Sequence, residues 1–248
     1  MGNGYVAVLD SGIGGFSCLI EAARLLPCER FLYFGDNKNA PYGSRKKGEL
    51  YYLTRKNLSF ILRYNVKAVI IGCNTLSMTV LPLIAPAVQV PLFGVYPPLN
   101  VKRGKALLFA TPPTCAKIKE SGNLKIFPLE KLAADIEGHK GCLESVDLSA
   151  HLAAAKVPME KADTLILGCT HYFFVKNQFI DHFCPRKVLS GEKNSALRLK
   201  KYLADSGIMG NNKEFTVDFI GENAEENYIF YNSVVKNIIF NAKNYKKI

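Results

Sequence analysis

Two cysteines stand in nearly the same local sequence, each at the end of an apolar run. The run over residues 68–71 leads through a glycine into Cys73, and the run over residues 164–167 leads through a glycine into Cys169. Short apolar runs bounded by glycine are typical of buried strands in a parallel sheet. Each thiol is therefore predicted at a strand end, before the first turn of a helix, where the local positive charge favours thiolate over thiol.

A free cysteine is more often a small buried apolar residue than a reactive one. The repeated Gly-Cys-polar context argues against that simpler interpretation for Cys73 and Cys169, but not for the other five cysteines. The two residues are about 100 positions apart, the size of one small domain. Two similar halves could thus present their strand-end thiols to each other across a cleft, where ligands bind in open α/β sheets.

Polar residues also follow the first predicted strand of each half. Residues 5–9 lead into Asp10-Ser11-Gly12 and a glycine-rich turn before a helix, which is a general anion site because helix-start amides point at the ligand. The spacing lacks the third glycine of a dinucleotide fingerprint. Asp10 could cap the helix or face the cleft. Thr114 follows the corresponding strand of the second half, with the same two interpretations, capping or carboxylate binding.

The elements that must position these residues alternate along the chain. Further apolar runs that predict strands are residues 30–34, 91–95, 106–109, 125–127 and 216–220. Segments with helical apolar spacing are residues 46–63, 129–162 with breaks, 175–183, 193–203 and the tail from residue 229, besides the one after residue 15. Strands that alternate with helices predict an α/β fold with mainly parallel sheets.

Composition narrows the protein class. The chain has 248 residues, of which 48% are hydrophobic and 21% charged, which is ordinary for a globular protein of one large or two small domains. Its seven cysteines show no disulfide framework or zinc-site spacing. We expect no signal peptide and no membrane span, and a cytoplasmic location. The net charge of +11 is spread out and carries no nucleic-acid motif, so we expect a solvated surface rather than a nucleic-acid partner.

Five short motifs occur in a fixed order along nearly the whole chain. They are Asp10-Ser11-Gly12-x-Gly14-Gly15, Gly35-Asp36 with Pro41-Tyr42-Gly43, Cys73-Asn74-Thr75, Gly94-Val95-x-Pro97 and Gly168-Cys169-Thr170-His171-Tyr172. Together they resemble the glutamate racemases, of the cofactor-independent aspartate/glutamate racemase family. The resemblance implies two similar three-layer α/β domains, residues 1–95 plus 208–248 and residues 96–207, with the active site in the cleft between them. It also implies a homodimer that needs no cofactor or metal.

The resemblance further implies interconversion of L- and D-glutamate, which supplies D-glutamate for peptidoglycan and so for the cell wall and cell shape. Racemisation removes the α-proton on one face and returns a proton on the other, so two facing acid/bases are needed. By resemblance Cys73 is the base toward D-glutamate and Cys169 the base toward L-glutamate, assisted by Asp10 and His171 respectively. The substrate-binding residues implied in the same way are Asp10, Ser11, Tyr42, Gly43, Asn74, Thr75, Thr114, Thr170 and His171. Glu137 is a further candidate for the part of the active site that the second domain contributes.

Several positions depart from the family pattern. Phe173 stands where the family usually has Pro, Tyr96-Pro97-Pro98 lacks the usual Glu, Asn37-Lys38-Asn39 replaces Thr-Ala-Arg, and no Asp lies near Ser190. These changes leave aspartate or another amino acid open as the substrate. A non-catalytic amino-acid-binding relative is a second alternative. A cysteine-nucleophile hydrolase is a third, although it would leave one Gly-Cys copy without a role.

Overall fold

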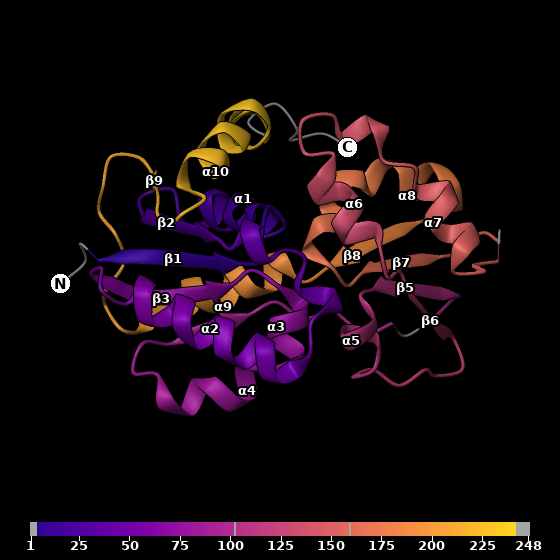
Figure 1. The fold of residues 1–248 in the computed structure, drawn as a ribbon, viewed down its shortest axis with the longest axis horizontal. Coiled ribbons are helices and arrows are strands. Elements are labelled where there is room, and N and C mark those ends of the chain that lie inside the picture. Colours follow the sequence, from indigo (N-terminus) through magenta and orange to yellow (C-terminus); the bar gives the residue numbers. More distant parts are fainter. Residues whose placement is uncertain (1–3, 102, 159, 242–248) are drawn as a thin grey trace.

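The computed structural model describes residues 4–101, 103–158 and 160–241, whose strands form two separate sheets lying side by side (Figure 1). The first sheet has the order β4-β3-β1-β2-β9, formed by β1 (Tyr5–Asp10), β2 (Arg30–Gly35), β3 (Val66–Ile71), β4 (Leu92–Gly94) and β9 (Thr216–Phe219). The second has the order β6-β5-β7-β8, formed by β5 (Ala106–Ala110), β6 (Leu124–Pro128), β7 (Thr164–Leu167) and β8 (Lys187–Ser190). Every strand pairing is parallel, which confirms the predicted fold class.

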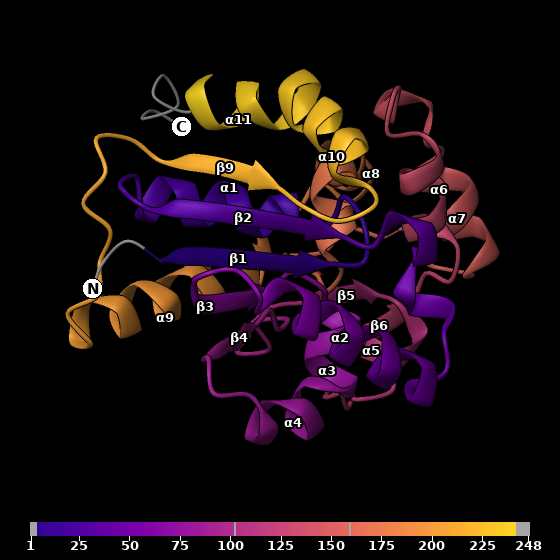
Figure 2. The same cartoon turned by 60° about the vertical axis from the view of Figure 1, so that its left-hand side comes forward.

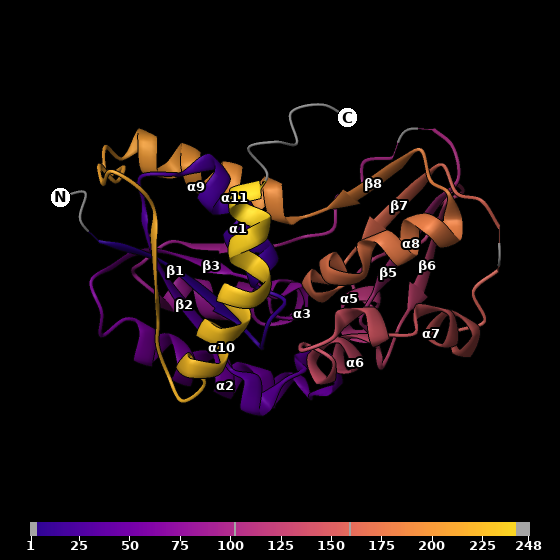
Figure 3. The same cartoon turned by 90° about the horizontal axis from the view of Figure 1, so that it is seen from above.

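Helices cover both faces of the first sheet (Figures 2 and 3). On one side lie α1 (Phe16–Leu25), α9 (Glu192–Asp205), α10 (Ala224–Phe230), the π-helix η6 (Tyr231–Val235) and α11 (Lys236–Asn241). On the other lie α2 (Lys47–Ile61), α3 (Asn74–Thr79), α4 (Leu81–Ile84) and the short η3 (Ala85–Ala87). The central strand β1 is almost wholly buried because both of its faces are covered, as in other parallel sheets.

The second sheet has a thicker and a thinner side. Its thicker side carries α6 (Leu132–Gly138), η4 (Leu143–Ser145), α7 (Leu148–Ala154), η5 (Thr170–Val175) and α8 (Lys176–Phe183). Phe109 of β5 packs there against Phe179 and Phe183 of α8. The short α5 (Pro112–Cys115) lies on the other side, where Cys115 and Ile118 pack on the sheet. One apolar cluster runs from α1 of the first half to α6 and α8 of the second, so the halves share buried surface.

Corresponding strand ends are held in the same way in the two sheets. Beyond the β1–β3 pairing the Gly72 amide donates to the Leu9 carbonyl at 2.8 Å. Beyond the β5–β7 pairing the Gly168 amide donates to the Phe109 carbonyl at 2.7 Å. Each cysteine that follows is thus placed at the carboxyl edge of its own sheet, beside the end of the neighbouring strand.

The chain crosses from the first sheet to the second and then returns. Strand β9 pairs with β2 at the edge of the first sheet, and α10, η6 and α11 pack over α1 (Figure 2). Helix α9, which lies before the predicted boundary at residue 207, packs against α1, so the exact domain boundaries stay a prediction. The ends of the predicted first domain, residues 1–3 and 242–248, lie outside the described residues. No helix in the described part of the chain is long and apolar enough to cross a lipid bilayer.

Candidate active site

The first half contributes a buried carboxyl at the end of β1. Asp10 is fully buried, and its Oδ2 accepts hydrogen bonds from the amides of Gly12 at 3.0 Å and Gly15 at 2.7 Å. Its Oδ1 has no hydrogen-bond partner among the described residues. Burial raises the pKa of Asp10, although the charge of His171 and the two amides act in the opposite direction. Asp10 is therefore not the helix cap, which is Gly15; one of its oxygens holds the glycine turn before the helix, and the other is without a hydrogen-bond partner among the described residues.

Cys73 lies immediately before α3, as the sequence predicted. Its pKa is raised, first by burial and then by the negative charge of Asp10. Hydrogen bonds from the amides of Thr75 and Leu76 lower the pKa, but by less. The expectation that the helix start favours a thiolate is therefore wrong for Cys73, because removal from water outweighs a few backbone amides.

The second half contributes a relay of three side chains. The Sγ of Cys169 is 3.8 Å from Nδ1 of His171, and Nε2 of that ring is 2.7 Å from Oε1 of Glu137. Burial alone would lower the pKa of His171, but its contacts with Cys169 and Glu137 outweigh burial and hold the pKa well above the usual 6.5. Burial would likewise raise the pKa of Glu137, yet the His171 hydrogen bond holds it below its usual value. The pair is thus an imidazolium and a carboxylate at neutral pH.

The glycine-rich turn of the first half packs directly on this relay. The Ile13 amide donates to Oε1 of Glu137 at 2.7 Å, joining the halves. A Cβ at position 12 would lie 1.7 Å from that oxygen, and one at position 14 would lie 2.5 Å from Nδ1 of His171. Only glycine permits this approach at the two positions. The negative charge of a Cys169 thiolate also contributes to the raised pKa of Cys73, so the two thiols lie within electrostatic reach of each other.

A chain of three hydroxyls crosses from one half to the other. Oγ1 of Thr75 is 2.8 Å from Oγ1 of Thr111, which in turn donates to Oγ1 of Thr114 at 3.1 Å. The capping alternative for Thr114 is wrong, because Thr114 lies inside α5 and Thr111 holds the position before it. Sequence reasoning missed Thr111, although a threonine at a strand end before two prolines was a usable signal.

The remaining predicted binding residues lie on the same edges. Ser11 and Thr170 are each 1% exposed. The side-chain amide of Asn74 donates to the Val95 carbonyl at 3.2 Å, and its Oδ1 has no hydrogen-bond partner in the described part of the chain. The Tyr42 ring is buried, and its hydroxyl donates to Asp36 at 2.5 Å. Gly43 lies against the side chain of Thr111.

The structure therefore gathers the predicted residues around two thiols in a closed, buried arrangement. Cys73 and Cys169 are each 6% exposed. Cys18 is instead a core residue, and Cys142 and Cys184 are exposed elsewhere on the surface. Each half thus places one of the two cysteines near titratable side chains, Cys73 near Asp10 and Cys169 near His171 and Glu137.

Comparisons with known proteins agree with this architecture. No family model matches the chain. The glutamate racemase of Clostridium acetobutylicum is 32% identical to it, across 81% of this chain and 84% of the relative. The solved structure of a glutamate racemase isoform from Bacillus anthracis has a TM-score of 0.80 at 25% identity, covering 94% of this chain and 95% of that one. The glutamate racemase of Thermus thermophilus, solved in complex with β-chloro-D-alanine, has a TM-score of 0.74 at 27% identity, covering 93% and 92%.

Proposed function

The chain belongs to the glutamate racemases, a family of isomerases, and from that premise we propose that it interconverts L- and D-glutamate by proton transfer between Cys73 and Cys169. The observation that carries this proposal is the paired arrangement of the two strand ends. Each sheet presents a cysteine at its carboxyl edge, and each cysteine has its own titratable neighbour, Asp10 in one half and His171 in the other. Two acid/bases on opposite faces of one carbon are what racemisation needs.

The pKa directions suit such a transfer. With L-glutamate bound, the Cys169 thiolate, stabilised by the imidazolium of His171, removes the α-proton. The Cys73 thiol donates its proton to the opposite face and becomes the thiolate. In the reverse direction the raised pKa of Cys73 makes its thiolate the stronger base. The α-ammonium group of the substrate supplies positive charge that favours the thiolate form.

Asp10 serves Cys73 in this scheme as His171 serves Cys169. Its pKa is raised by burial, and its unpartnered Oδ1 is the atom that we propose exchanges a proton with the Cys73 thiol. Glu137 holds the His171 ring in place and keeps it charged. The roles of the two pairs are thereby matched, although one uses a carboxyl and the other an imidazole.

The polar groups around the thiols are suited to an amino-acid substrate. The backbone amides of Tyr42 and Gly43 donate no hydrogen bond to any other described residue, so they are available to a carboxylate. The hydroxyls of Ser11, Thr75, Thr114 and Thr170 and the free Oδ1 of Asn74 complete the binding set that we propose. The Thermus thermophilus relative was solved with β-chloro-D-alanine, which is consistent with a site for small amino acids.

The proposal is tested with each enantiomer of glutamate and of aspartate in deuterated water, following α-deuterium and optical rotation together. We expect both glutamate enantiomers to lose optical rotation while gaining deuterium, at a higher kcat/KM than aspartate. A higher kcat/KM with aspartate would reassign the substrate within the family. Binding of glutamate with neither deuterium incorporation nor loss of rotation would show a non-catalytic relative, and a trapped acyl-enzyme would favour a hydrolase.

The cellular context belongs to the same proposal. We propose that the product D-glutamate supplies peptidoglycan synthesis in the cytoplasm, and that the enzyme works as a homodimer without cofactor or metal. Depletion in a host cell should produce a requirement for added D-glutamate. Light scattering coupled to size-exclusion chromatography measures the oligomeric state, and a monomer mass at micromolar concentration would contradict the dimer.

A further inference from the structure

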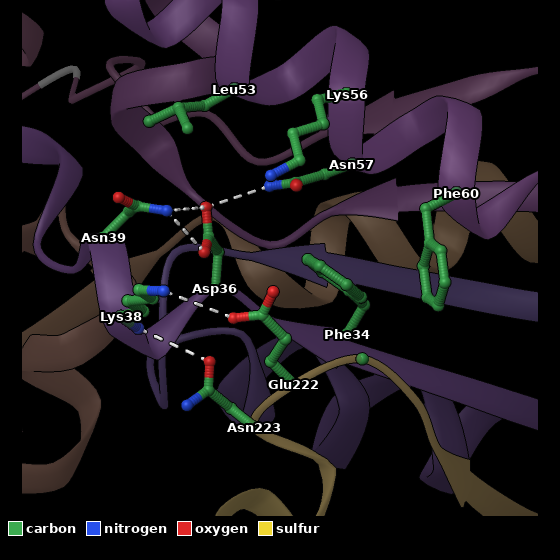
Figure 4. Close-up of a pocket in the computed structure, with 11 residues that line it drawn as sticks. Phe34, Asp36, Lys38, Asn39, Leu53, Lys56, Asn57, Phe60, Glu222 and Asn223 are labelled. Carbon is green, nitrogen blue, oxygen red and sulfur yellow. Dashed lines mark hydrogen bonds and ion pairs between the residues drawn. The ribbon is translucent and has the colours of Figure 1, made fainter.

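The carboxylate of Asp36, which directly follows β2, accepts four hydrogen bonds although no role in the reaction has been given to it. It is 8% exposed, and its carboxylate accepts from the Tyr42 hydroxyl at 2.5 Å and from Nδ2 of Asn57 at 3.1 Å. Nδ2 of Asn39 reaches both carboxylate oxygens, at 2.9 and 3.1 Å (Figure 4). Nδ2 of Asn57 also donates to the Tyr42 hydroxyl at 3.1 Å. Three side chains on three segments thus meet at one carboxylate.

The partners of this carboxylate are neutral. Among the described residues no lysine or arginine lies within 4 Å of Asp36 as an ion-pair partner. Hydrogen bonds from neutral donors have strong directional requirements, and a buried hydroxyl bound to a carboxylate is held in one orientation. The arrangement fixes the position of Tyr42 more than it balances charge.

Fixing Tyr42 fixes the segment that faces the second half. Tyr42 begins the short helix η2 (Tyr42–Ser44), and the next residue, Gly43, lies against the Thr111 side chain. Thr111 belongs to the hydroxyl chain that also includes Thr75 and Thr114. The free amides of Tyr42 and Gly43 are therefore held beside these hydroxyls by the hydrogen bonds of the Tyr42 side chain to Asp36 and Asn57.

We propose that Asp36, assisted by Asn57, is a positioning residue that holds the Tyr42–Gly43 amides in place for the substrate carboxylate. The inference rests on the proposed racemase function and deepens it, because it assigns the support of the substrate site. Fixing binding groups before the substrate arrives removes an ordering cost from binding, so loss of the anchor acts on substrate affinity first. The Asp36 amide donates to the Asp10 carbonyl at 3.1 Å, but the Asp36 carboxylate bonds only to Asn39, Tyr42 and Asn57, so a change of the side chain affects the chemical step less.

A pocket behind the carboxylate provides a specific test. It has a volume of about 700 Å³, and the residues that line it include the apolar side chains of Phe34, Leu53 and Phe60 and the polar side chain of Asn39 (Figure 4). Asp36 and Asn57 themselves line it, and the exposed Lys56 stands beside them. Truncation of Asp36 to alanine would therefore leave a hole that is continuous with this pocket. A small free carboxylate can enter there and accept the Tyr42 hydrogen bond.

The experiment compares Asp36→Ala with and without sodium formate, at constant ionic strength set with sodium chloride. We expect the KM for both glutamate enantiomers to rise about tenfold, the cost of one buried hydrogen bond to a charged group, with kcat changed by less than about threefold. Formate at tens of millimolar should return the KM of this variant toward the wild-type value. It should not improve wild type or Tyr42→Phe, which lacks the hydroxyl that formate would bind.

Asp218→Ala is the matched control, because Asp218 also accepts a tyrosine hydroxyl, that of Tyr5 at 2.6 Å, but at the first sheet's outer strand β9. Its KM should equal the wild-type value, with or without formate. The KM of the double variant Asp36→Ala/Tyr42→Phe should not exceed that of Asp36→Ala, because that variant already removes the hydrogen bond that Tyr42 donates to Asp36. Additive KM increases, or no response to formate in a folded Asp36→Ala, would overturn the proposal.

Two further arms keep the result interpretable. Asp36→Asn preserves the shape of the side chain and should show a KM between those of wild type and Asp36→Ala. Formate should not change this KM, since no hole is opened. If the alanine variant fails to fold, the KM of Asp36→Asn is the measurement that tests the positioning role. A wild-type KM for Asp36→Asn together with an unfolded alanine variant would mean that Asp36 serves stability only. If the wild-type chain shows no racemisation, the proposed function fails by itself, and the Kd of glutamate by calorimetry then replaces KM in every comparison.

Discussion

Replacing Glu137 by glutamine tests how much of the second acid/base pair depends on one negative charge. Gln is nearly the same size, and its Oε1 can still accept from Nε2 of His171 and from the Ile13 amide, so the packing between the halves is retained. The side chains of Glu137 and His171 are 10% and 3% exposed, so solvation of the imidazolium by water does not compensate for the lost negative charge. The variant therefore isolates the ionic part of the contact.

The magnitude follows from the type of hydrogen bond. A bond to a charged group contributes about 1.5–3 kcal/mol and a neutral one about 0.5–1.5 kcal/mol, so the loss is about 1–1.5 kcal/mol. The loss should lower the pKa of His171 from its raised value toward the usual 6.5. Since the imidazolium is proposed to stabilise the Cys169 thiolate, kcat/KM of the variant should decline with rising pH at a lower pH than kcat/KM of wild type.

Stability should change over a defined range of pH. The raised pKa of His171 contributes stability that is complete below the unfolded value near 6.5 and is lost as pH rises through the folded value. The lowered pKa of Glu137 contributes stability present above the unfolded value near 4.5 and lost as pH falls through the folded value. The ion pair thus stabilises the fold across neutral pH, where Glu137→Gln should lower Tm by about 2–4 °C, with a smaller difference in acid.

The assay is kcat/KM in both directions from pH 6 to 9, with thermal unfolding in the same buffers. Because the equilibrium constant of a racemase is one, kcat/KM must fall equally for the two enantiomers. Glu130→Gln, at an exposed position before the same helix, is the control and should match wild type. Superimposable pH profiles for Glu137→Gln and wild type would refute the assignment of Glu137 as the group that keeps His171 charged.

Cys73→Ser and Cys169→Ser should each lower the rate of racemisation at least about 10³-fold, because a hydroxyl is a far weaker base than a thiolate. The control Cys184→Ser should keep a rate within a few-fold of wild type. Near wild-type turnover by either of the first two variants would contradict the two-base scheme. His171→Asn should retard α-hydrogen exchange from L-glutamate and Asp10→Asn that from D-glutamate, and equal isotope partitioning in both variants would rule out thiol-specific helpers. Activity should survive dialysis against EDTA without pyridoxal absorbance, and recovery of lost activity on adding a metal or pyridoxal phosphate would contradict a cofactor-free reaction.

Much of the site could be predicted because parallel sheets bring strand ends together. Asp10 and Cys73 follow different strands, and their proximity required only the rule that carboxyl ends share one edge. Glu137 could not be placed in this way, because it lies on α6, away from any strand end, and meets His171 of η5 only where these two segments of the second half pack together. Asn57 is similar: its position in the pattern of α2 is unremarkable, and its partner Asp36 is distant in sequence.

Two other features, strand β8 and the pKa of Cys73, could not be predicted because they depend on parts of the chain that are distant in sequence. The four residues of β8 are at most half-buried and include Lys187 and Ser190, so no apolar run marked this strand. The pKa of Cys73 was expected in the wrong direction because the helix start is visible in the sequence, whereas the burial that outweighs it is supplied by the whole fold. Local pattern predicted where the thiols lie, and tertiary contact determined how readily Cys73 ionises.

The return of β9 to the first sheet has a consequence for the order of events during translation. The edge of β2 that β9 covers leaves the ribosome roughly 180 residues before β9 does, which is about 10–40 s at ordinary elongation rates. Throughout that interval β2 has an unpaired edge, and Phe16 and Tyr33 lack the covering aromatic rings of Phe219 and Phe230. The second sheet, whose strands are contiguous in the chain, is complete earlier. A nascent chain stalled before residue 216 should therefore bind chaperones through its first half, while its second half already resists protease.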